Sequence, residues 1–189
     1  MGRPIPQNYF LYVGAIEKTK NVETLVKAIW EINKETDNDY SLVLVSGFGN
    51  NIDNISKLVK KLNLEKNVFF TSYLSQEELV EVFSNAVALV NPSLLEGFGL
   101  TLLEGMSAGI PVIAANTTAL PEIIGEAGVL FNPHSVSELS EIMIRVAESK
   151  DYSDKLVERG FNRIKEFPWE KAAQEHLDIY HQVHNENKK

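Results

Sequence analysis

The sequence predicts an α/β fold with a doubly wound, mainly parallel sheet of six strands. Short apolar runs alternate along the chain with amphipathic stretches at helical spacing. The runs are apolar throughout, which indicates strands that are buried on both faces of a sheet. Buried strands with helices between them are typical of parallel α/β domains. In such a sheet, the ligand site lies beyond the carboxyl ends of the strands.

The first half of the chain contains three expected strands and three expected helices. Apolar runs place strands at 10–13, 41–46 and 68–70. Helices are expected where apolar residues recur every three or four positions, at 22–32, 52–62 and 76–85. Ser75 and Glu78 have the spacing of a capping box, in which each side chain accepts a backbone N–H of the other residue, so the third helix should begin near Gln76.

The second half repeats the pattern and then becomes purely helical. Strands are expected at 86–90, 111–114 and 129–131, with a helix at 100–108 that Gly109 ends. Ser135 and Glu138 form a second capping-box pattern, which opens a helix toward Glu148. Beyond Lys150 the chain is helical, interrupted at 167–170, and ends in a polar tail from His184.

These elements divide the chain into three parts. We expect an N-terminal lead at 1–9, a Rossmann-like domain at 10–165, and a C-terminal helix with its tail at 166–189. The loops at the carboxyl edge of the predicted sheet, where a ligand is expected, are 14–20, 47–51, 72–75, 91–99 and 115–120.

Composition excludes several classes of site. The 189 residues include no cysteine, which excludes disulfides, thiolate zinc sites and cysteine nucleophiles. The net charge of −8 argues against non-specific nucleic-acid binding, which needs a basic surface. An anionic ligand must therefore be held by local features. No apolar run approaches the roughly 20 residues that span a bilayer, and the first residues lack a leader pattern, so we expect a cytoplasmic protein.

The segment 92–104 has the most informative pattern in the chain. Gly97 and Gly99 flank a phenylalanine where a helix begins after a buried strand. Glycines let the backbone approach a ligand, and the N–H groups of a helix N-terminus bind anions. Glu96 and Glu104 stand on either side, eight positions apart. Two carboxylates beside an anion site repel it unless they face neutral hydroxyls, and a nucleotide sugar supplies both an anion and hydroxyls.

This segment resembles the signature of the retaining glycosyltransferases of family 4, which have the GT-B fold. The resemblance extends over about residues 9–180, to the C-terminal, donor-binding half only. Further motifs match in the family's order at other loops: Tyr12-Val13-Gly14 with Lys20-Asn21, the helix start at 75–79, Ala119-Leu120-Pro121-Glu122 and Phe167-Pro168-Trp169.

The resemblance implies roles for individual residues. Lys20 matches the lysine that neutralises the donor diphosphate, and Glu96 the glutamate that contacts the transferred sugar, so the resemblance implies that both are catalytic residues. Glu104 matches the glutamate that binds the ribose, and Leu74 the residue that contacts the base. Backbone groups are expected to hold the sugar and phosphates at the positions next to Glu96. These are Phe98, Gly99, Leu100 and Thr101, with Gly14 at the end of the first strand.

One position departs from the family. An arginine usually follows the glycine that ends the first strand, where it assists the lysine, and here that place is Ala15. Stabilisation of a departing diphosphate would then depend on Lys20 and the helix N-terminus, with Lys18 as a candidate substitute.

Other patterns have plain structural interpretations. Gly47-Phe48-Gly49 is expected to be a turn more than a ligand contact, and Asp37-Asn38-Asp39 a turn at the wrong end of the sheet for a metal site. The last helix carries three histidines whose spacings do not suit a metal: His176, His181 and His184. Trp30 and Trp169 are expected to pack in the core or to dock against another surface.

The resemblance implies a hexosyltransferase that uses a UDP-sugar or GDP-sugar without a metal or other cofactor. The acceptor would be a hydroxyl of a glycan or a lipid-linked glycan, in mannosyltransferase-like polysaccharide assembly. Uracil, guanine and adenine stay open as the base. We expect that the N-terminal acceptor domain is absent, that the fragment alone is inactive, and that any membrane attachment belongs to that domain. The alternatives are a non-catalytic nucleotide-sugar-binding module and a GT-B-fold epimerase.

Overall fold

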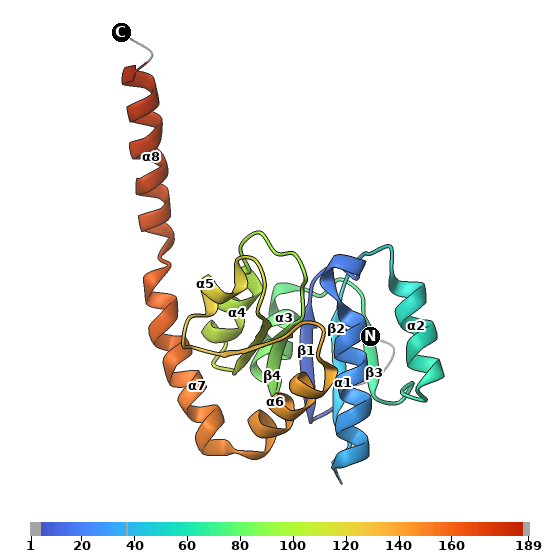
Figure 1. Ribbon diagram of the computed structural model, residues 1–189. Helices are drawn as coiled ribbons and strands as arrows, with labels where there is room; N and C mark the ends of the chain where they lie inside the picture. Colours follow the sequence, from blue (N-terminus) through green and yellow to red (C-terminus); the bar gives the residue numbers. More distant parts are fainter. Residues whose placement is uncertain (1–4, 37, 187–189) are drawn as a thin grey trace.

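The computed structural model describes residues 5–36 and 38–186 (Figure 1). It contains a six-stranded parallel sheet with the strand order β3-β2-β1-β4-β5-β6, as the sequence predicts. Because β1 and β4 are neighbours and the chain runs outward from each, the order reverses between them, and this is the switch point of the sheet. The strands are β1 (Tyr9–Val13), β2 (Ser41–Val45), β3 (Val68–Thr71), β4 (Ala88–Asn91), β5 (Val112–Ala115) and β6 (Val129–Phe131).

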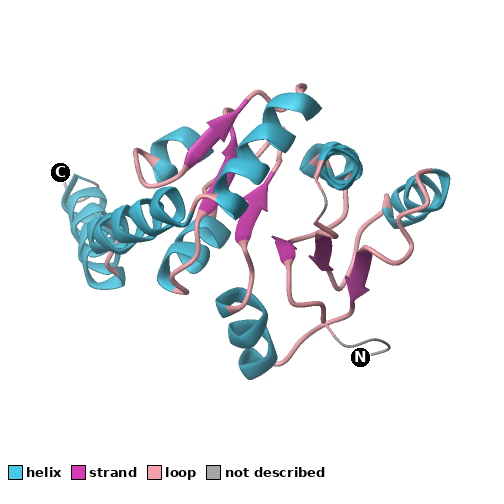
Figure 2. Cartoon of the chain, turned by 90° about the horizontal axis from the view of Figure 1, so that it is seen from below, coloured by secondary structure: helices cyan, strands magenta, loops and turns pink. Residues whose placement is uncertain are grey.

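Helices cover both sides of the sheet (Figure 2). Helix α1 packs against α2 and α6, and α4 packs against α5 and α7. Two 3-10 turns, η1 (Lys18–Lys20) and η2 (Ile164–Glu166), connect elements at the edges. The helices are α1 (Val22–Glu35), α2 (Ile52–Lys61), α3 (Gln76–Ser84), α4 (Leu100–Ser107), α5 (Leu120–Ile124), α6 (Val136–Glu148), α7 (Lys150–Arg163) and α8 (Trp169–Glu186).

The core is formed by strands that are buried on both faces. All five residues of β2 and all four of β4 and β5 are buried. The hydrophobic stripe of α1, which includes Leu25, Ile29 and Ile32, is fully enclosed against them. Both observations follow from the apolar runs and the helical spacing in the sequence.

The two predicted capping boxes have different outcomes. At α3 the box is complete, because Ser75 accepts the Glu78 N–H and the Glu78 carboxylate accepts the Ser75 N–H. At α6 only half of it forms. Ser135 Oγ accepts the Glu138 N–H, but the Glu138 carboxylate accepts the N–H of Asn132 at 3.0 Å. The second box was therefore wrong in its carboxylate half, although the helix begins where it was expected.

Two elements differ from expectation. Strand β4 begins at Ala88, later than the predicted 86, because the Ala86 N–H is bonded to Phe83 at the end of α3. Helix α5 was not predicted, since five residues are too few for a visible period. Its end is held by Arg163 of α7, whose guanidinium donates to the carbonyl oxygens of Ile123 and Glu122.

Helix α8 extends away from the body of the domain (Figure 1). It has no buried residue, and Trp169 at its start is 75% exposed, so Trp169 lies outside the core and the alternative, docking against another surface, stays a prediction. Trp30 is partly buried, with Lys34 Nζ 4.1 Å from the ring centroid. The helix continues through His184 to Glu186, so it includes the first three residues of the expected polar tail.

Some expectations concern residues outside the described part of the chain. This group includes the expected lack of a leader pattern, which concerns residues 1–4, Asp37 of the predicted turn and the last three residues of the tail. Tyr9, assigned to the lead, is the first residue of β1. Among the described residues, none of the helices has the length and apolarity that crossing a bilayer requires.

Candidate functional site

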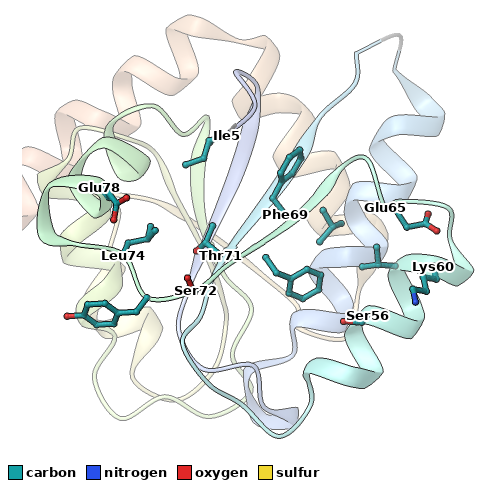
Figure 3. Close-up of a pocket in the computed structure, with 13 residues that line it drawn as sticks. Ile5, Ser56, Lys60, Glu65, Phe69, Thr71, Ser72, Leu74 and Glu78 are labelled. Atoms are coloured by element: carbon teal, nitrogen blue, oxygen red, sulfur yellow. The ribbon is translucent and has the colours of Figure 1, made fainter. Parts of the chain in front are cut away.

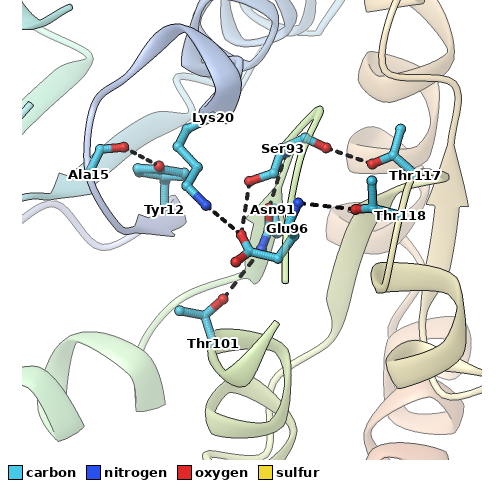
Figure 4. Close-up of polar contacts among 9 residues, drawn as sticks. All are labelled: Tyr12, Ala15, Lys20, Asn91, Ser93, Glu96, Thr101, Thr117 and Thr118. Carbon is cyan, nitrogen blue, oxygen red and sulfur yellow. Dashed lines mark hydrogen bonds and ion pairs between the residues drawn. The ribbon is translucent and has the colours of Figure 1, made fainter. Parts of the chain in front are cut away.

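The site lies at the carboxyl edge of the sheet, at the switch point between β1 and β4. Three loops meet there: the loop after β1 that includes η1, the loop from β4 to α4, and the loop from β5 to α5 (Figure 4). All three are among the loops that the sequence indicated. Backbone hydrogen bonds connect the first two, since Leu94 N–H donates to the carbonyl of Thr19 at 2.8 Å.

Lys20 and Glu96 form an ion pair at the centre of this edge. Lys20 Nζ lies 2.8 Å from Glu96 Oε2, and the two side chains are 23% and 22% exposed. Ser93 Oγ donates to the same carboxylate oxygen at 3.3 Å. The structure thus brings together the two residues that the sequence singled out as catalytic, although 76 positions separate them.

The β5–α5 loop holds the loop that carries Glu96. Thr118 Oγ1 accepts the N–H of Glu96 at 3.1 Å, and Thr117 Oγ1 donates to the carbonyl of Ser93 at 2.7 Å (Figure 4). The backbone segment from Ser93 to Glu96 is therefore tied at both ends to a neighbouring loop.

Helix α4 presents its N-terminus to the same edge. Gly99 occupies the N-cap position at φ +100°, a conformation that favours glycine, and an added Cβ would lie 3.0 Å from Leu120 Cδ2. Glycine has no side chain to cap the helix, so the first N–H groups are left for a ligand. Thr101 in the first turn is linked to the end of β4, since Asn91 Nδ2 donates to its hydroxyl at 3.4 Å.

Glu104 lies one turn further along α4, beside a cavity of about 1000 Å³. Phe98 and Leu100 line the cavity next to it, and residues of α3 and of the chain at 164–175 line the rest. These largely apolar surroundings remove water from the carboxyl group and raise the pKa of Glu104 above its usual 4.5. Phe98, Leu100 and Glu104 thus share one cavity, as expected if they contact one ligand.

Tyr12 supports the loop that follows β1. Its hydroxyl donates to the carbonyl of Ala15 at 2.7 Å, beneath Gly14 at φ +150°. Burial raises the pKa of Tyr12 strongly, with smaller contributions from the negative charges of Glu96 and Glu17. The phenol therefore stays protonated and acts as a hydrogen-bond donor at neutral pH.

Comparison with known proteins decides the family. The model of the family "glycosyl transferases group 1" matches residues 2–163. The chain belongs to this family. It is 33% identical over 174 residues to the O-antigen chain mannosyltransferase B of Escherichia coli, a match that covers 92% of the chain and 46% of that protein. The chain spans between 21% and 46% of the length of the curated relatives it matches.

Solved structures of glycosyltransferases have the same fold. Sucrose-phosphate synthase from Thermosynechococcus elongatus superimposes with a TM-score of 0.85 at 30% identity, over 97% of this chain and 47% of that one. The C-terminal domain of a glycosyl transferase group 1 family protein from Francisella tularensis, LpcC, superimposes with a TM-score of 0.72 at 25% identity. That match covers 84% of this chain and 85% of the other, so a domain of this extent has been crystallised separately.

Two predicted features of this glycosyltransferase domain lie apart from the Lys20–Glu96 pair. The Leu74 side chain is 7% exposed and lines a different cavity of about 670 Å³, beside β3 (Figure 3). A contact between the base and the backbone of Leu74 stays a prediction. The glycine-flanked segment bends at Gly47 and contacts the loop after β1, since the carbonyl of Phe48 accepts the Ile16 N–H at 3.1 Å. A Cβ on Gly49 would lie 2.3 Å from the Ile16 carbonyl oxygen, so glycine is required there.

Ala15 stands at the position where the resemblance predicts an arginine. Ala15 contributes its carbonyl to Tyr12 and no charge, while Lys18 lies in the same 3-10 turn as Lys20. Among the described residues, no group of three or more histidine, aspartate or glutamate side chains could hold a metal ion.

Sequence reasoning missed three polar side chains of the site. Ser93, Thr117 and Thr118 hold the Glu96 loop, and each lies in or beside a loop that was expected to face the ligand. Single hydroxyl residues in loops have no distinctive spacing, so the pattern of the sequence gave no signal for them.

Proposed function

We propose that this chain is the donor-binding half of a retaining glycosyltransferase of family 4. It would transfer a hexose, with mannose the first candidate, from a nucleoside-diphosphate sugar to a hydroxyl of a glycan or lipid-linked acceptor. The observation that carries this proposal is the Lys20–Glu96 ion pair beside the N-terminus of α4, at the switch point of the sheet. The identity to a mannosyltransferase of O-antigen assembly supports the choice of sugar.

We assign a part of the ligand to each group. Lys20 and the first N–H groups of α4 would receive the two phosphates, and both stabilise the negative charge that grows as the diphosphate leaves. Glu96 would accept hydrogen bonds from hydroxyls of the transferred sugar. Glu104, in the neighbouring cavity, would accept them from the ribose.

The proposed reaction exchanges one bond to the sugar for another on the same face. The bond between the anomeric carbon and the diphosphate oxygen breaks, and a bond to the acceptor oxygen forms. The acceptor's proton passes to a phosphate oxygen of the leaving group. No step of this proposal requires a metal, because Lys20 and the α4 N-terminus supply the positive potential.

A second domain would complete the enzyme. The chain spans 46% of the mannosyltransferase it resembles, and α8 carries exposed apolar side chains, none of which is buried against the described domain. These are Trp169, Leu177, Ile179, Tyr180 and Val183. We propose that residues 10–165 are the Rossmann-like unit, that an N-terminal domain supplies the acceptor site and any membrane attachment, and that this chain alone binds donor without turnover.

A non-catalytic nucleotide-sugar-binding module is the second candidate. Ala15 favours it, because the arginine that assists the lysine in the family would be missing. Such a module would retain donor binding and would lack transfer even when the second domain is present.

Calorimetric titration of the 189-residue chain with UDP, GDP and ADP tests donor binding. We expect one nucleotide to bind preferentially with a free energy of about −4 to −8 kcal/mol, which is millimolar to micromolar strength. Glu104→Ala should weaken it, whereas Glu141→Ala on α6 is the matched control and should not. A folded chain that binds none of the three nucleotides would overturn the proposal.

A further inference from the structure

Thr118 has a backbone conformation that its residue type rarely adopts. Its φ is +47°, in the left-handed region. Of the three non-glycine residues with positive φ in the described part of the chain, the other two are asparagines, which tolerate this conformation. A β-branched residue is a true outlier there, and glycine would fit without strain. Strain of this kind persists where the side chain does something that glycine cannot do.

The hydroxyl of Thr118 makes a contact that glycine could not make. Oγ1 accepts the backbone N–H of Glu96 at 3.1 Å, from a loop 22 positions away in the sequence. The next residue, Thr117, donates its hydroxyl to the carbonyl of Ser93 at 2.7 Å. The two threonines therefore hold both ends of the four-residue segment that carries the Glu96 carboxylate (Figure 4).

These backbone contacts differ in kind from the ion pair. The Lys20–Glu96 contact joins two side chains, and a diphosphate that attracts Lys20 would compete with it. The Thr118 hydroxyl is bonded to the main-chain N–H of Glu96. This hydrogen bond can therefore persist when Lys20 leaves the Glu96 carboxylate and contacts a ligand. The Thr19 carbonyl, which accepts the Leu94 N–H, holds the segment from the opposite side.

We propose that Thr118 is a positioning residue that fixes the backbone of Glu96, and through it the carboxylate that faces the donor sugar. This inference rests on the proposed function for its role in donor binding. Its structural part, the restraint of Glu96 by the Thr118 hydroxyl, holds for the chain without ligand. Thr118 acts on the sugar end of the donor only, because the phosphates face Lys20 and α4.

Two variants separate the hydroxyl from the backbone conformation. Thr118→Gly removes the acceptor and suits positive φ, so the chain should fold with an unchanged unfolding temperature. Thr118→Ser keeps the acceptor. In a ¹⁵N-labelled chain, we expect amide hydrogen exchange at Glu96 to become at least tenfold faster in Thr118→Gly and to stay at the wild-type rate in Thr118→Ser. Unchanged exchange in Thr118→Gly would overturn the inference.

Titration then tests the role in binding, with GDP against GDP-mannose and UDP against UDP-glucose. Thr118→Gly should bind the sugar nucleotide at least tenfold more weakly and the nucleoside diphosphate within twofold of wild type. Thr118→Ser should restore the affinity. Equal losses for both ligands, or none, would overturn the role in sugar binding. If the wild-type chain binds neither ligand, the proposed function fails, while the exchange measurement still decides whether Thr118 restrains Glu96.

Discussion

Lys20 Nζ and Glu96 Oε2 lie 2.8 Å apart across the switch point of the sheet. One residue follows β1 and the other follows β4, so the contact closes the edge where the strand order reverses. About a fifth of each side chain is exposed, and an ion pair of this kind contributes on the order of 1 kcal/mol. A ligand with phosphates for Lys20 and hydroxyls for Glu96 can replace the contact at small cost.

Replacement of Lys20 should weaken diphosphate ligands specifically. We expect Lys20→Met to reduce the affinity for the preferred nucleoside diphosphate about 10- to 100-fold, since a hydrogen bond to a charged group contributes about 1.5–3 kcal/mol. Affinity for the nucleoside without phosphates should not change. Lys27→Met is the matched control, because Lys27 pairs with Glu23 on the surface of α1. The assignment of Lys20 fails if both variants lose affinity equally.

We predict that Glu104 lowers the free energy of unfolding as the pH rises through the range in which its carboxyl group titrates. Desolvation raises the pKa of Glu104 in the folded chain above 4.5. Between the pKa of the unfolded chain and that of the folded chain, the folded state therefore binds more protons than the unfolded state. The free energy of unfolding therefore decreases across that window and stays lower above it. Glu104→Gln should be more stable than wild type at pH 7, with the difference closing at lower pH. Urea unfolding at pH 4 to 8 measures this, and a constant difference across that range would contradict it.

The turn at Gly49 should tolerate no side chain. In Gly49→Ala the Cβ would collide with the Ile16 carbonyl at a φ of +152°, so we expect a loss of about 2–4 kcal/mol in the free energy of unfolding. Gly47→Ala is the control two positions away, where no atom lies within 4 Å of the added Cβ, and it should change stability by less than about 0.5 kcal/mol. Similar values for the two variants in urea titrations would refute the close approach.

Arg163 should be important for the end of α5. Its guanidinium donates to the Ile123 carbonyl at 3.0 Å and to that of Glu122, and it lies 4.9 Å from the Phe167 ring. We expect Arg163→Ala to lower the free energy of unfolding by about 2–3 kcal/mol. Arg159→Ala removes a single long contact to Glu126, so a loss below about 0.5 kcal/mol is expected. Thermal unfolding of both variants compares them, and equal midpoints would contradict this role.

The fold was predictable because buried strands and helix faces give the sequence a strong periodic pattern of apolar residues. The apolar runs of β1 and β2 and the stripe of α1 each appear in the sequence as the structure has them. Helix α5 gives no such pattern, because it has only five residues. Its end is capped by Arg163, which belongs to a helix far away in the sequence. The direction of α8 was not predictable either, because none of its residues is buried against the described domain.

The candidate site was predictable where the chemistry needs unusual residues together. Glycines around Phe98 and the two flanking glutamates form a pattern that chance spacing rarely gives, and the structure places Glu96 against Lys20. Thr118 could not be found in this way. Its role depends on a φ of +47° and on a hydrogen bond between separate loops, and neither can be read from a single sequence.

The central claim is that Lys20 and Glu96 bind different parts of one donor. Titration of the Glu96→Gln variant with a nucleoside diphosphate and with its sugar tests this most directly. Because the substitution frees Lys20 and weakens the acceptor for sugar hydroxyls, we predict equal or tighter binding of the diphosphate and at least tenfold weaker binding of the sugar nucleotide. Equal losses for both ligands, or unchanged binding of the sugar nucleotide, would contradict the account.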